Sequence, residues 1–518
     1  MKIPHLALVL AGGLLAVPAA VLGVEEPAPP PAPAGEAPAA PIATAESDDA
    51  MLERISGEMM KKVEEIRGLK FKQDVKRVWK SRDEAKSEML AELEKQDEKL
   101  DLASISKLYA LLGIIKDGED IKAKFAELIA AAAGGYYIPE TKVFSLVRGM
   151  NLDANRPVVF HELVHAVEDQ YFDWNDRTER YADEDRSDPG EALHAVVEGS
   201  ARRFENLFVD SEPGLRAKYM AAQMQESIKQ YAAVRKAPPA LAIAVGMFPY
   251  ENGSLFLSKV LPAMVAAEGS KYASETAALA AIYADPPMST EQILHPEKYL
   301  GARDLPRQVA LPDAAGSLGE GWRQLIQDSY GEFTLGLVLN ASLLPNVFET
   351  QVASVATPAG HVLFRGDTGK AVTGWDADRF ALYESKDGQH CLAWVTAWDS
   401  PADAAEFAEV YGKVVVRKYG TMVKGEDGKS TRQPPASAAF EHAGWSGTRW
   451  TGTRNGDSVV VVKGDLAILV ERVPAASLPA FLEAVAKASV IRDPKDAVPA
   501  ADGGAVAPDM PKLPEGGK

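Results

Sequence analysis

Two histidines four residues apart, with a glutamate beside the first, are the residues of this chain best suited to chemistry. They form the segment His161-Glu162-Leu163-Val164-His165. In a helix, side chains four positions apart project from the same face, so both rings can direct a nitrogen at one ion. Glu162 lies roughly 100° further around the helix axis, beside the ion. The pattern predicts a zinc site in which Glu162 holds a zinc-bound water.

Local signals predict a helix around this pair. Asn155 can cap its start, and Pro157 suits its first turn. A stripe of apolar residues at helical spacing would bury one side and partly desolvate the histidines; it comprises Phe160, Leu163, Val164, Val167 and Tyr171. The alternative is a histidine pair that is merely hydrogen-bonded on a partly buried helix face.

A second predicted helix supplies a third ligand. Residues 188–191, Asp-Pro-Gly-Glu, are typical of a helix start with Asp188 as the cap, and the helix that follows carries Glu198. His194, one turn earlier on the same face, could coordinate instead or support Glu198. Small residues beside Glu198 would let two helices approach closely; they are Gly199, Ser200 and Ala201. We predict one zinc ion held by His161, His165 and Glu198.

Three protein ligands leave the fourth tetrahedral position of zinc open, as in catalytic sites. Zinc would activate water and polarise a carbonyl, while Glu162 accepts the water proton and delivers it to a leaving amine. Three residues are candidates for the hydrogen-bond donor to the developing oxyanion, namely Tyr250, His295 and Tyr299. The predicted reaction is the hydrolysis of an amide such as a peptide bond.

Composition bounds the class of protein and its partners. The net charge of -18 over 518 residues argues against nucleic acid as a partner, because nucleic-acid binders need a concentrated basic face. Cys391 is the only cysteine, so the chain has no internal disulfide, and its apolar surroundings predict an inert core residue. The acidic segment 173–188 could bind calcium, but its irregular spacing favours a solvated loop.

The N-terminus is typical of an export signal. Lys2 precedes an apolar run over residues 6–22 that ends in small residues, which predicts a signal peptide at 1–23 and a periplasmic or extracellular location. A membrane anchor, and with it a membrane contact, is the alternative if the segment stays uncleaved. Proline and alanine dominate a predicted linker at 24–48, and a similar composition predicts a disordered tail at 493–518.

Hydrophobic periodicity divides the rest into two predicted α+β domains. The first, residues 49–350, is predominantly helical, with two short strands within 136–147 just before the histidine pair. The second, residues 351–492, contains two strand-strand-helix units, which predict a small four-stranded sheet. Their strands are expected at 378–384 with 390–398 and at 458–462 with 466–471, and their helices at 401–415 and 477–487.

The residues around the metal motif resemble a family of exported bacterial proteins with a His-Glu-x-x-His motif and a gluzincin-like metal site. The likeness covers residues 161–173 and 198–201, and it extends to segments spread over most of the folded chain, at 135–142, 286–296 and 374–380. Ile138 stands where the family pattern usually has an acidic residue. The resemblance implies a zincin-like fold over about 50–350, with the strand at 143–147 edging the cleft and pairing with an extended peptide.

These observations favour an exported zinc metallopeptidase of the gluzincin type, acting on a peptide or protein substrate. One alternative is a catalytically inactive zincin-like binding protein of the cell envelope, in which zinc only stabilises the fold. Another is a purely structural envelope protein. The intact Glu162 favours the enzyme, because a stabilising metal site needs no carboxylate beside the first histidine.

Overall fold

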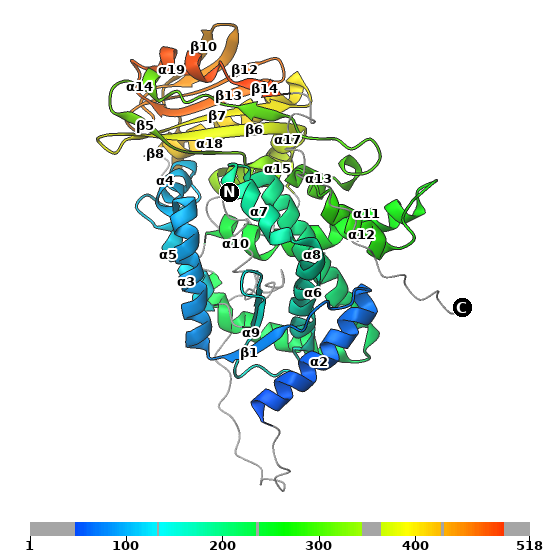
Figure 1. Cartoon of the computed structure of the whole chain (residues 1–518). Coiled ribbons are helices and arrows are strands. Elements are labelled where there is room, and N and C mark those ends of the chain that lie inside the picture. The colour runs from blue at the N-terminus through cyan, green and yellow to red at the C-terminus, as the bar shows by residue number, and fades with distance from the viewer. Residues whose placement is uncertain (1–46, 132–133, 235–237, 344–363, 426–428, 492–518) are drawn as a thin grey trace.

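The computed structural model describes residues 47–131, 134–234, 238–343, 364–425 and 429–491. The fold is α+β, as expected: a helical N-terminal region is followed by a sheet-rich C-terminal domain, which lies across the top of Figure 1. The expected signal peptide, nearly all of the linker, and the tail lie outside the described residues. None of the described helices is long and apolar enough to cross a bilayer.

Four helices open the described chain, in agreement with the helical periodicity there: α2 (Asp48–Arg67), α3 (Arg82–Leu100), α4 (Leu102–Leu112) and α5 (Ile121–Ala131). A short strand, β1 (Lys76–Lys80), interrupts them and was not predicted. It consists of two lysines, an arginine and only two apolar residues, and its pairing with a distant strand is a tertiary contact.

The two strands expected before the histidine pair are present as β2 (Gly135–Ile138) and β3 (Val143–Val147), which pair antiparallel. β1 pairs parallel with the other side of β3, so the strand order is β1-β3-β2. The expectation that residues 143–147 form the cleft edge is therefore wrong, because β3 is the central strand with both sides paired. β2 is the edge strand that packs against the metal-motif helix.

The metal-motif helix is α6 (Arg156–Phe172), and it begins after Asn155 as predicted. Asn155 makes no side-chain capping bond, however, because its amide donates to the Asn151 carbonyl instead. The acidic segment that follows is not a loop: α7 (Trp174–Asp183) occupies most of it.

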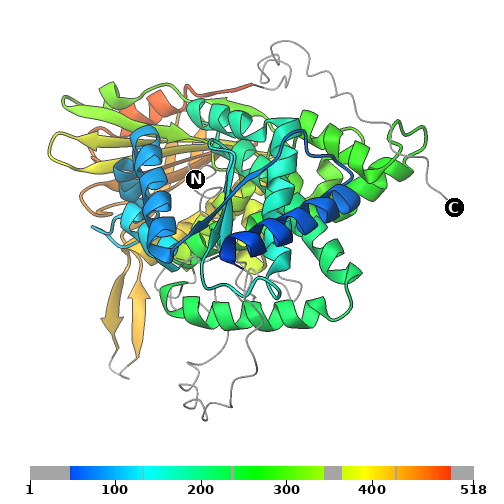
Figure 2. The ribbon, with the colours of Figure 1, turned by 60° about the horizontal axis from the view of Figure 1, so that its bottom comes forward.

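In Figure 2, α2 crosses the front of the helical region, and the hairpin of β8 (Thr421–Lys424) and β9 (Ser430–Gln433) projects from the body.

The helix that carries Glu198 is α8 (Ser187–Ser211), and its start differs from the prediction. Asp188 lies inside the first turn rather than capping it, and its side chain accepts bonds from the amide and hydroxyl of Thr290. Asp328, from a strand 141 residues away, accepts the amide and hydroxyl of Ser187 at the helix start. A distant carboxylate therefore takes the role predicted for Asp188.

Helices continue to residue 343, with two short strands and single turns of other helix types among them. In chain order these elements are α9 (Leu215–Val234), α10 (Pro239–Gly246), the π-helix η2 (Phe248–Asn252), α11 (Gly253–Ala266), α12 (Glu275–Ala284), α13 (Thr290–Leu294), the 3-10 helix η3 (Pro296–Lys298), β4 (Gln308–Ala310), α14 (Ala315–Leu318), β5 (Trp322–Asp328) and α15 (Gly331–Leu343).

A glycine contact sets the distance between α8 and α11. A Cβ on Gly199 would lie 2.2 Å from the carbonyl carbon of Gly253, and a Cβ on Gly253 would lie 1.8 Å from the oxygen of Ala195. The small residues beside Glu198 thus permit a close approach, as predicted. Gly199 admits α11, whereas Ser200 contacts α6 through a bond to Glu168.

The C-terminal sheet has seven strands in the order β10-β11-β12-β13-β7-β6-β5. The four predicted strands are its central four: β6 (Trp375–Ser385), β7 (His390–Trp398), β12 (Asp457–Lys463) and β13 (Leu466–Val473). The two predicted helices are α18 (Pro401–Tyr419) and α19 (Leu478–Val485). The prediction of a four-stranded sheet was wrong, because three more strands extend its two edges: β5, β10 (Ser437–His442) and β11 (Trp445–Trp450).

The predicted domain boundary at residue 350 lies outside the described residues, but strands on its two sides pair. β5 precedes it and pairs with β6, and β4 pairs with β14 (Ser489–Ile491). The sheet is buried on both faces, because alternate residues of its strands enter two different clusters: Phe380 and Leu382 pack toward α18, whereas Ala381 and Tyr383 pack toward α19. The remaining short helix, α17 (Gly366–Val372), packs against α18.

The thiol of Cys391 lies within this sheet on β7 and is fully buried. Burial raises the pKa of the thiol well above its usual value, which keeps it protonated. The expectation of an inert core cysteine is confirmed as far as its placement is concerned.

Replacing Gly199 by alanine should destabilise the protein by about 1–3 kcal/mol or more, because the added methyl group forces α8 and α11 apart. Thermal and urea unfolding would measure the loss. Gly57→Ala in α2 is the matched control, since no atom lies within 4 Å of its Cβ position. That control should stabilise by about 0.5–1 kcal/mol through the unfolded chain. Equal behaviour of the two variants would contradict the close contact.

Candidate metal centre

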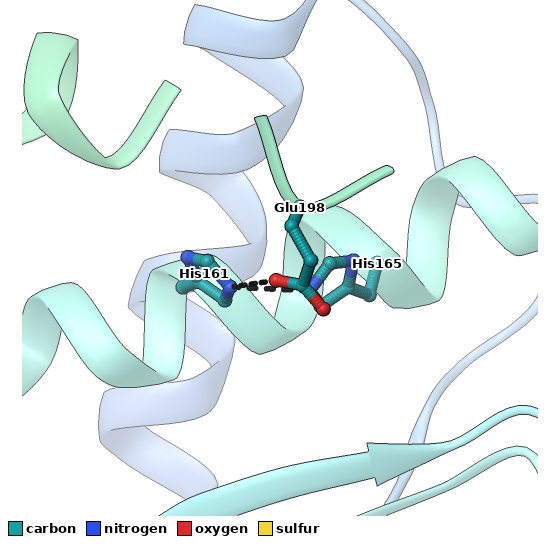
Figure 3. Close-up of side chains that lie close together, drawn as sticks. All are labelled: His161, His165 and Glu198. Atoms are coloured by element: carbon teal, nitrogen blue, oxygen red, sulfur yellow. Dashed lines mark hydrogen bonds and ion pairs between the residues drawn. The ribbon is translucent and has the colours of Figure 1, made fainter. Parts of the chain in front are cut away.

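Three side chains from two helices converge on one point, as Figure 3 shows. His161 and His165 project from α6, and Glu198 projects from α8. The Nε2 atoms of His161 and His165 lie 3.1 Å apart. Glu198 Oε2 lies 3.3 Å from His161 Nε2 and 3.4 Å from His165 Nε2. All three predicted ligands are therefore brought together. Among the described residues, they form the one group of three or more such side chains close enough to hold an ion.

The spacing of these three atoms fits zinc. Ligand bonds of about 2.0–2.1 Å in a tetrahedron require ligand atoms about 3.3–3.4 Å apart. The observed triangle, with sides of 3.1, 3.3 and 3.4 Å, lies close to that requirement. Two imidazoles and one carboxylate are also a donor set that zinc accepts, and three ligands leave one position open.

Glu162 is held beside the three ligands by the edge strand. The backbone amide of Tyr137 in β2 donates to Glu162 Oε2 at 2.9 Å, which leaves Oε1 without that constraint. The Tyr137 hydroxyl and Lys142 Nζ both donate to Asp169 of α6 at 2.7 Å. The β2–β3 hairpin is thereby fixed to the helix at two levels, and Glu162 has a defined orientation.

A carboxylate that the sequence reasoning missed orients the first histidine. Glu205 Oε2 lies 3.0 Å from His161 Nδ1, which holds the ring with Nε2 pointing at the centre. Arg202 donates to the second oxygen of Glu205 at 3.0 Å. Glu205 follows Glu198 by seven residues, two turns along the same face of α8, and that spacing was the available signal.

His194 does not replace Glu198 as a ligand; it lies behind that residue. Its Nε2 is 3.6 Å from Glu198 Oε1, the oxygen that faces away from the histidine pair. Glu191 is the next polar side chain along this face, and burial raises its pKa. Glu191, His194 and Glu198 are all buried, but neither ring nitrogen of His194 makes a hydrogen bond within the described residues. The positioning role of His194 stays a prediction.

Of the three candidate oxyanion donors, the structure brings one to the site. The Tyr250 ring, in the π-helix η2, stacks on His161 with 5.9 Å between centroids. Burial and the charges of Glu198 and Glu162 raise the pKa of Tyr250 well above its usual value, so the hydroxyl stays a donor. His295 and Tyr299 lie elsewhere: they bond to Glu332 and to the carbonyl of Asp285.

The electrostatics of the site favour a bound positive charge. Burial lowers the pKa of His161, but hydrogen bonds to Glu198 and Glu205 outweigh it and raise that pKa to about 10. Burial opposes ionisation of Glu198, yet the surrounding histidines hold its pKa well below the usual value. For Glu162, burial dominates and raises the pKa to about 8. A site that holds a proton this firmly attracts cations, including a metal ion.

One buried carboxylate fixes α6 relative to its neighbours. Glu168 accepts from Arg67 of α2 at 2.5 Å, from Ser200 of α8 at 2.6 Å and from Tyr283 of α12 at 2.7 Å. The Arg67 and Glu168 side chains are both fully buried. The Arg67 guanidinium also lies over the Phe204 ring, 5.0 Å from its centroid. These contacts set the positions of α6 and α8, on which the metal ligands depend.

Comparison with known proteins informs only the C-terminal part of the chain. Residues 323–473 match a family described as a domain of unknown function (DUF8575). The matched span runs from β5 through β13 and so includes all seven strands of the large sheet, while the three candidate ligands lie outside it. No curated protein and no solved structure matched the chain.

Glu168→Ala should cost about 3–5 kcal/mol, because it leaves the Arg67 guanidinium buried without its partner charge. Chemical unfolding would measure the loss. Glu65→Ala is the control, since Glu65 makes an exposed pair with Lys62 on α2 and should change stability by less than about 1 kcal/mol. A Glu168 variant as stable as this control would show that the buried bonds do not hold α6.

Proposed function

We propose that this protein is an exported zinc-dependent peptidase of the gluzincin type. The observation that carries the proposal is the triangle of His161 Nε2, His165 Nε2 and Glu198 Oε2, with sides of 3.1–3.4 Å, beside an oriented Glu162. Export is proposed from the N-terminal sequence alone.

Each residue of the centre would have a separate task. His161, His165 and Glu198 would hold the ion, and Glu205 would keep the His161 ring turned toward it. When bound, zinc would act as a Lewis acid on the substrate carbonyl and make a water molecule easier to deprotonate. Glu162 would take the proton of the attacking water and pass it to the nitrogen of the leaving amine. One peptide bond and one water thus give a carboxylic acid and an amine.

Two further groups support this assignment. The Tyr137 amide holds one oxygen of Glu162, so the other can face the reacting water without a search among rotamers. The Tyr250 hydroxyl, beside His161, could donate to the oxygen on which negative charge develops. Burial favours both interactions, since Glu162 is only 2% exposed and Glu198 only 1%.

The low exposure also bears on the substrate. His161 and His165 are only 6% and 5% exposed, so a folded protein surface could not reach them. An extended chain could approach along the outer edge of β2, which is unpaired within the three-stranded sheet. An unfolded polypeptide is therefore the appropriate test substrate.

The purified protein should contain one zinc ion per chain and should cleave an unfolded protein. Glu162→Gln should keep the zinc and lose at least about a hundredfold in kcat, because the general base is removed while all three ligands remain. Elemental analysis and a gel-based or fluorogenic cleavage assay measure the two quantities. Glu65→Gln, at an exposed position on α2, is the matched control and should keep full activity.

The outcomes separate the alternatives. Zinc at one per chain with no cleavage by the wild type would contradict the peptidase and favour a zinc-stabilised binding protein. A folded wild-type protein without zinc, even after incubation with the metal, would contradict the metal centre itself.

Glu205→Gln should lower zinc affinity by about 10- to 100-fold, because His161 loses the carboxylate that orients its ring. Competition with a chromogenic chelator would measure the affinity. Glu212→Gln, near the end of the same helix and paired with Arg156 at the surface, should leave it unchanged. Equal affinities in the two variants would contradict the role of Glu205.

A further inference from the structure

A cavity of about 610 Å³ lies where the helical region meets the large sheet, away from the candidate metal centre. Its walls come from the start of α8, the segment 305–312 that includes β4, the start of β6, and the chain around β14. Asp188 lines the cavity ten residues before Glu198 on α8, which corresponds to about 15 Å along the helix axis. The volume suits a small organic molecule.

A buried carboxylate oxygen in the cavity wall has no partner. Asp188 is only 2% exposed, and its Oδ1 accepts both bonds from Thr290, whereas its Oδ2 accepts none from the residues that the structure describes. The wall has two other acids. Glu184 pairs with Arg186, and Asp378 accepts from the amides of Tyr330 and Gly331 and from two indoles. An unsatisfied buried oxygen costs free energy, so Asp188 Oδ2 calls for a donor from a ligand.

Basic side chains line the same cavity. Lys487 is exposed and makes no ion pair with any residue in the described part of the chain. Arg379 donates to the carbonyl of Asp185, which carries no net charge, and Arg186 pairs with Glu184 at 3.3 Å. Arg379 also forms an ion pair with Asp185 at 3.9 Å. Lys487 therefore presents the positive charge of the lining that no carboxylate of the described residues pairs with, and Arg379 lies in the same wall.

Apolar groups form much of the remaining wall. Trp375, Val309 and Leu311 are buried residues of this lining, and Met288 and Leu305 are among its other apolar residues. A ligand for this cavity needs a donor for Asp188, an acid for Lys487 and Arg379, and an apolar body between them.

We propose that this cavity binds a small zwitterion with an apolar body, namely a free amino acid or a short peptide. Its ammonium group would donate to Asp188 Oδ2, and its carboxylate would pair with Lys487 and Arg379. The ammonium would satisfy the orphan oxygen, and it suits a carboxylate for which burial opposes ionisation. This site does not depend on the metal centre or on the proposed peptidase activity.

Isothermal titration of the full-length protein with leucine and with Leu-Leu tests the proposal and distinguishes the two ligand sources. At least one should bind, while N-acetyl-leucine, which lacks the ammonium, and leucinamide, which lacks the carboxylate, should bind at least about tenfold more weakly. Failure of both zwitterions to bind at millimolar concentration, or a half-ligand that binds as tightly as the zwitterion, would overturn the proposal.

Variants locate the binding. Lys487→Met should weaken the zwitterion about tenfold and leave leucinamide unchanged, whereas Lys463→Met, an exposed lysine outside the cavity, should change neither. Asp188→Asn keeps the acceptor for Thr290 and should weaken the zwitterion and leucinamide but not N-acetyl-leucine. If that variant does not fold, Ala310→Trp, at an exposed position of the lining, should block all binding.

A metal-site variant separates this proposal from the peptidase. His161→Ala should bind the zwitterion as the wild type does, whatever its zinc content. Loss of binding in His161→Ala, with binding intact in Lys487→Met, would place the ligand on the metal and overturn the proposed cavity site.

Discussion

The bonds to Glu168 are the interaction on which the arrangement of the helical region depends. A carboxylate fully removed from water is costly unless every oxygen is satisfied, and here Arg67, Ser200 and Tyr283 satisfy it from three different helices. Glu168 follows His165 by three residues, so it faces nearly the same side of α6 one turn further on. The hydrogen bonds that stabilise the buried Glu168 carboxylate therefore also set the distance between the histidine pair and Glu198 of α8.

The second constraint is the pair of glycines, Gly199 and Gly253, at the contact between α8 and α11, where a larger side chain would keep the two helices apart. Gly199 follows Glu198 directly, and its contact with Gly253 brings α11 against α8. Tyr250 precedes Gly253 by three residues, so this approach also carries its ring onto His161. The candidate centre thus combines ligands held by a buried ion pair with a donor held by a backbone contact. Neither support belongs to the three candidate ligands, yet both determine whether the ligand atoms lie at coordinating distances.

The large sheet contributes to the helical region through its edges and ends. Asp328, at the end of β5, bonds to Ser187 at the start of α8, and Asp378 on β6 accepts the amides that begin α15. The first backbone amides of a helix have no acceptor within the helix. These carboxylates accept hydrogen bonds from such amides and so join the sheet to the helix starts. The cavity lined by Asp188 lies at this junction, between the helix that carries Glu198 and the segment that matches a known family.

The sequence by itself determined the candidate ligands and many of the local elements. The pair His161 and His165 follows from helical spacing, and Glu198 follows from the helix start at 188–191 and the small residues beside it. The strands β6, β7, β12 and β13 follow from alternating apolar runs between turns. Local patterns are sufficient there because each element buries a periodic face. Tertiary structure alone decided that β2, and not β3, is the edge strand beside α6, and that Asp328 and not Asp188 serves the start of α8. It also decided that Tyr250 lies beside the candidate ligands while His295 and Tyr299 do not. Those outcomes depend on contacts between residues distant in sequence, where the pairing of a strand edge or a buried charge is set by the whole fold.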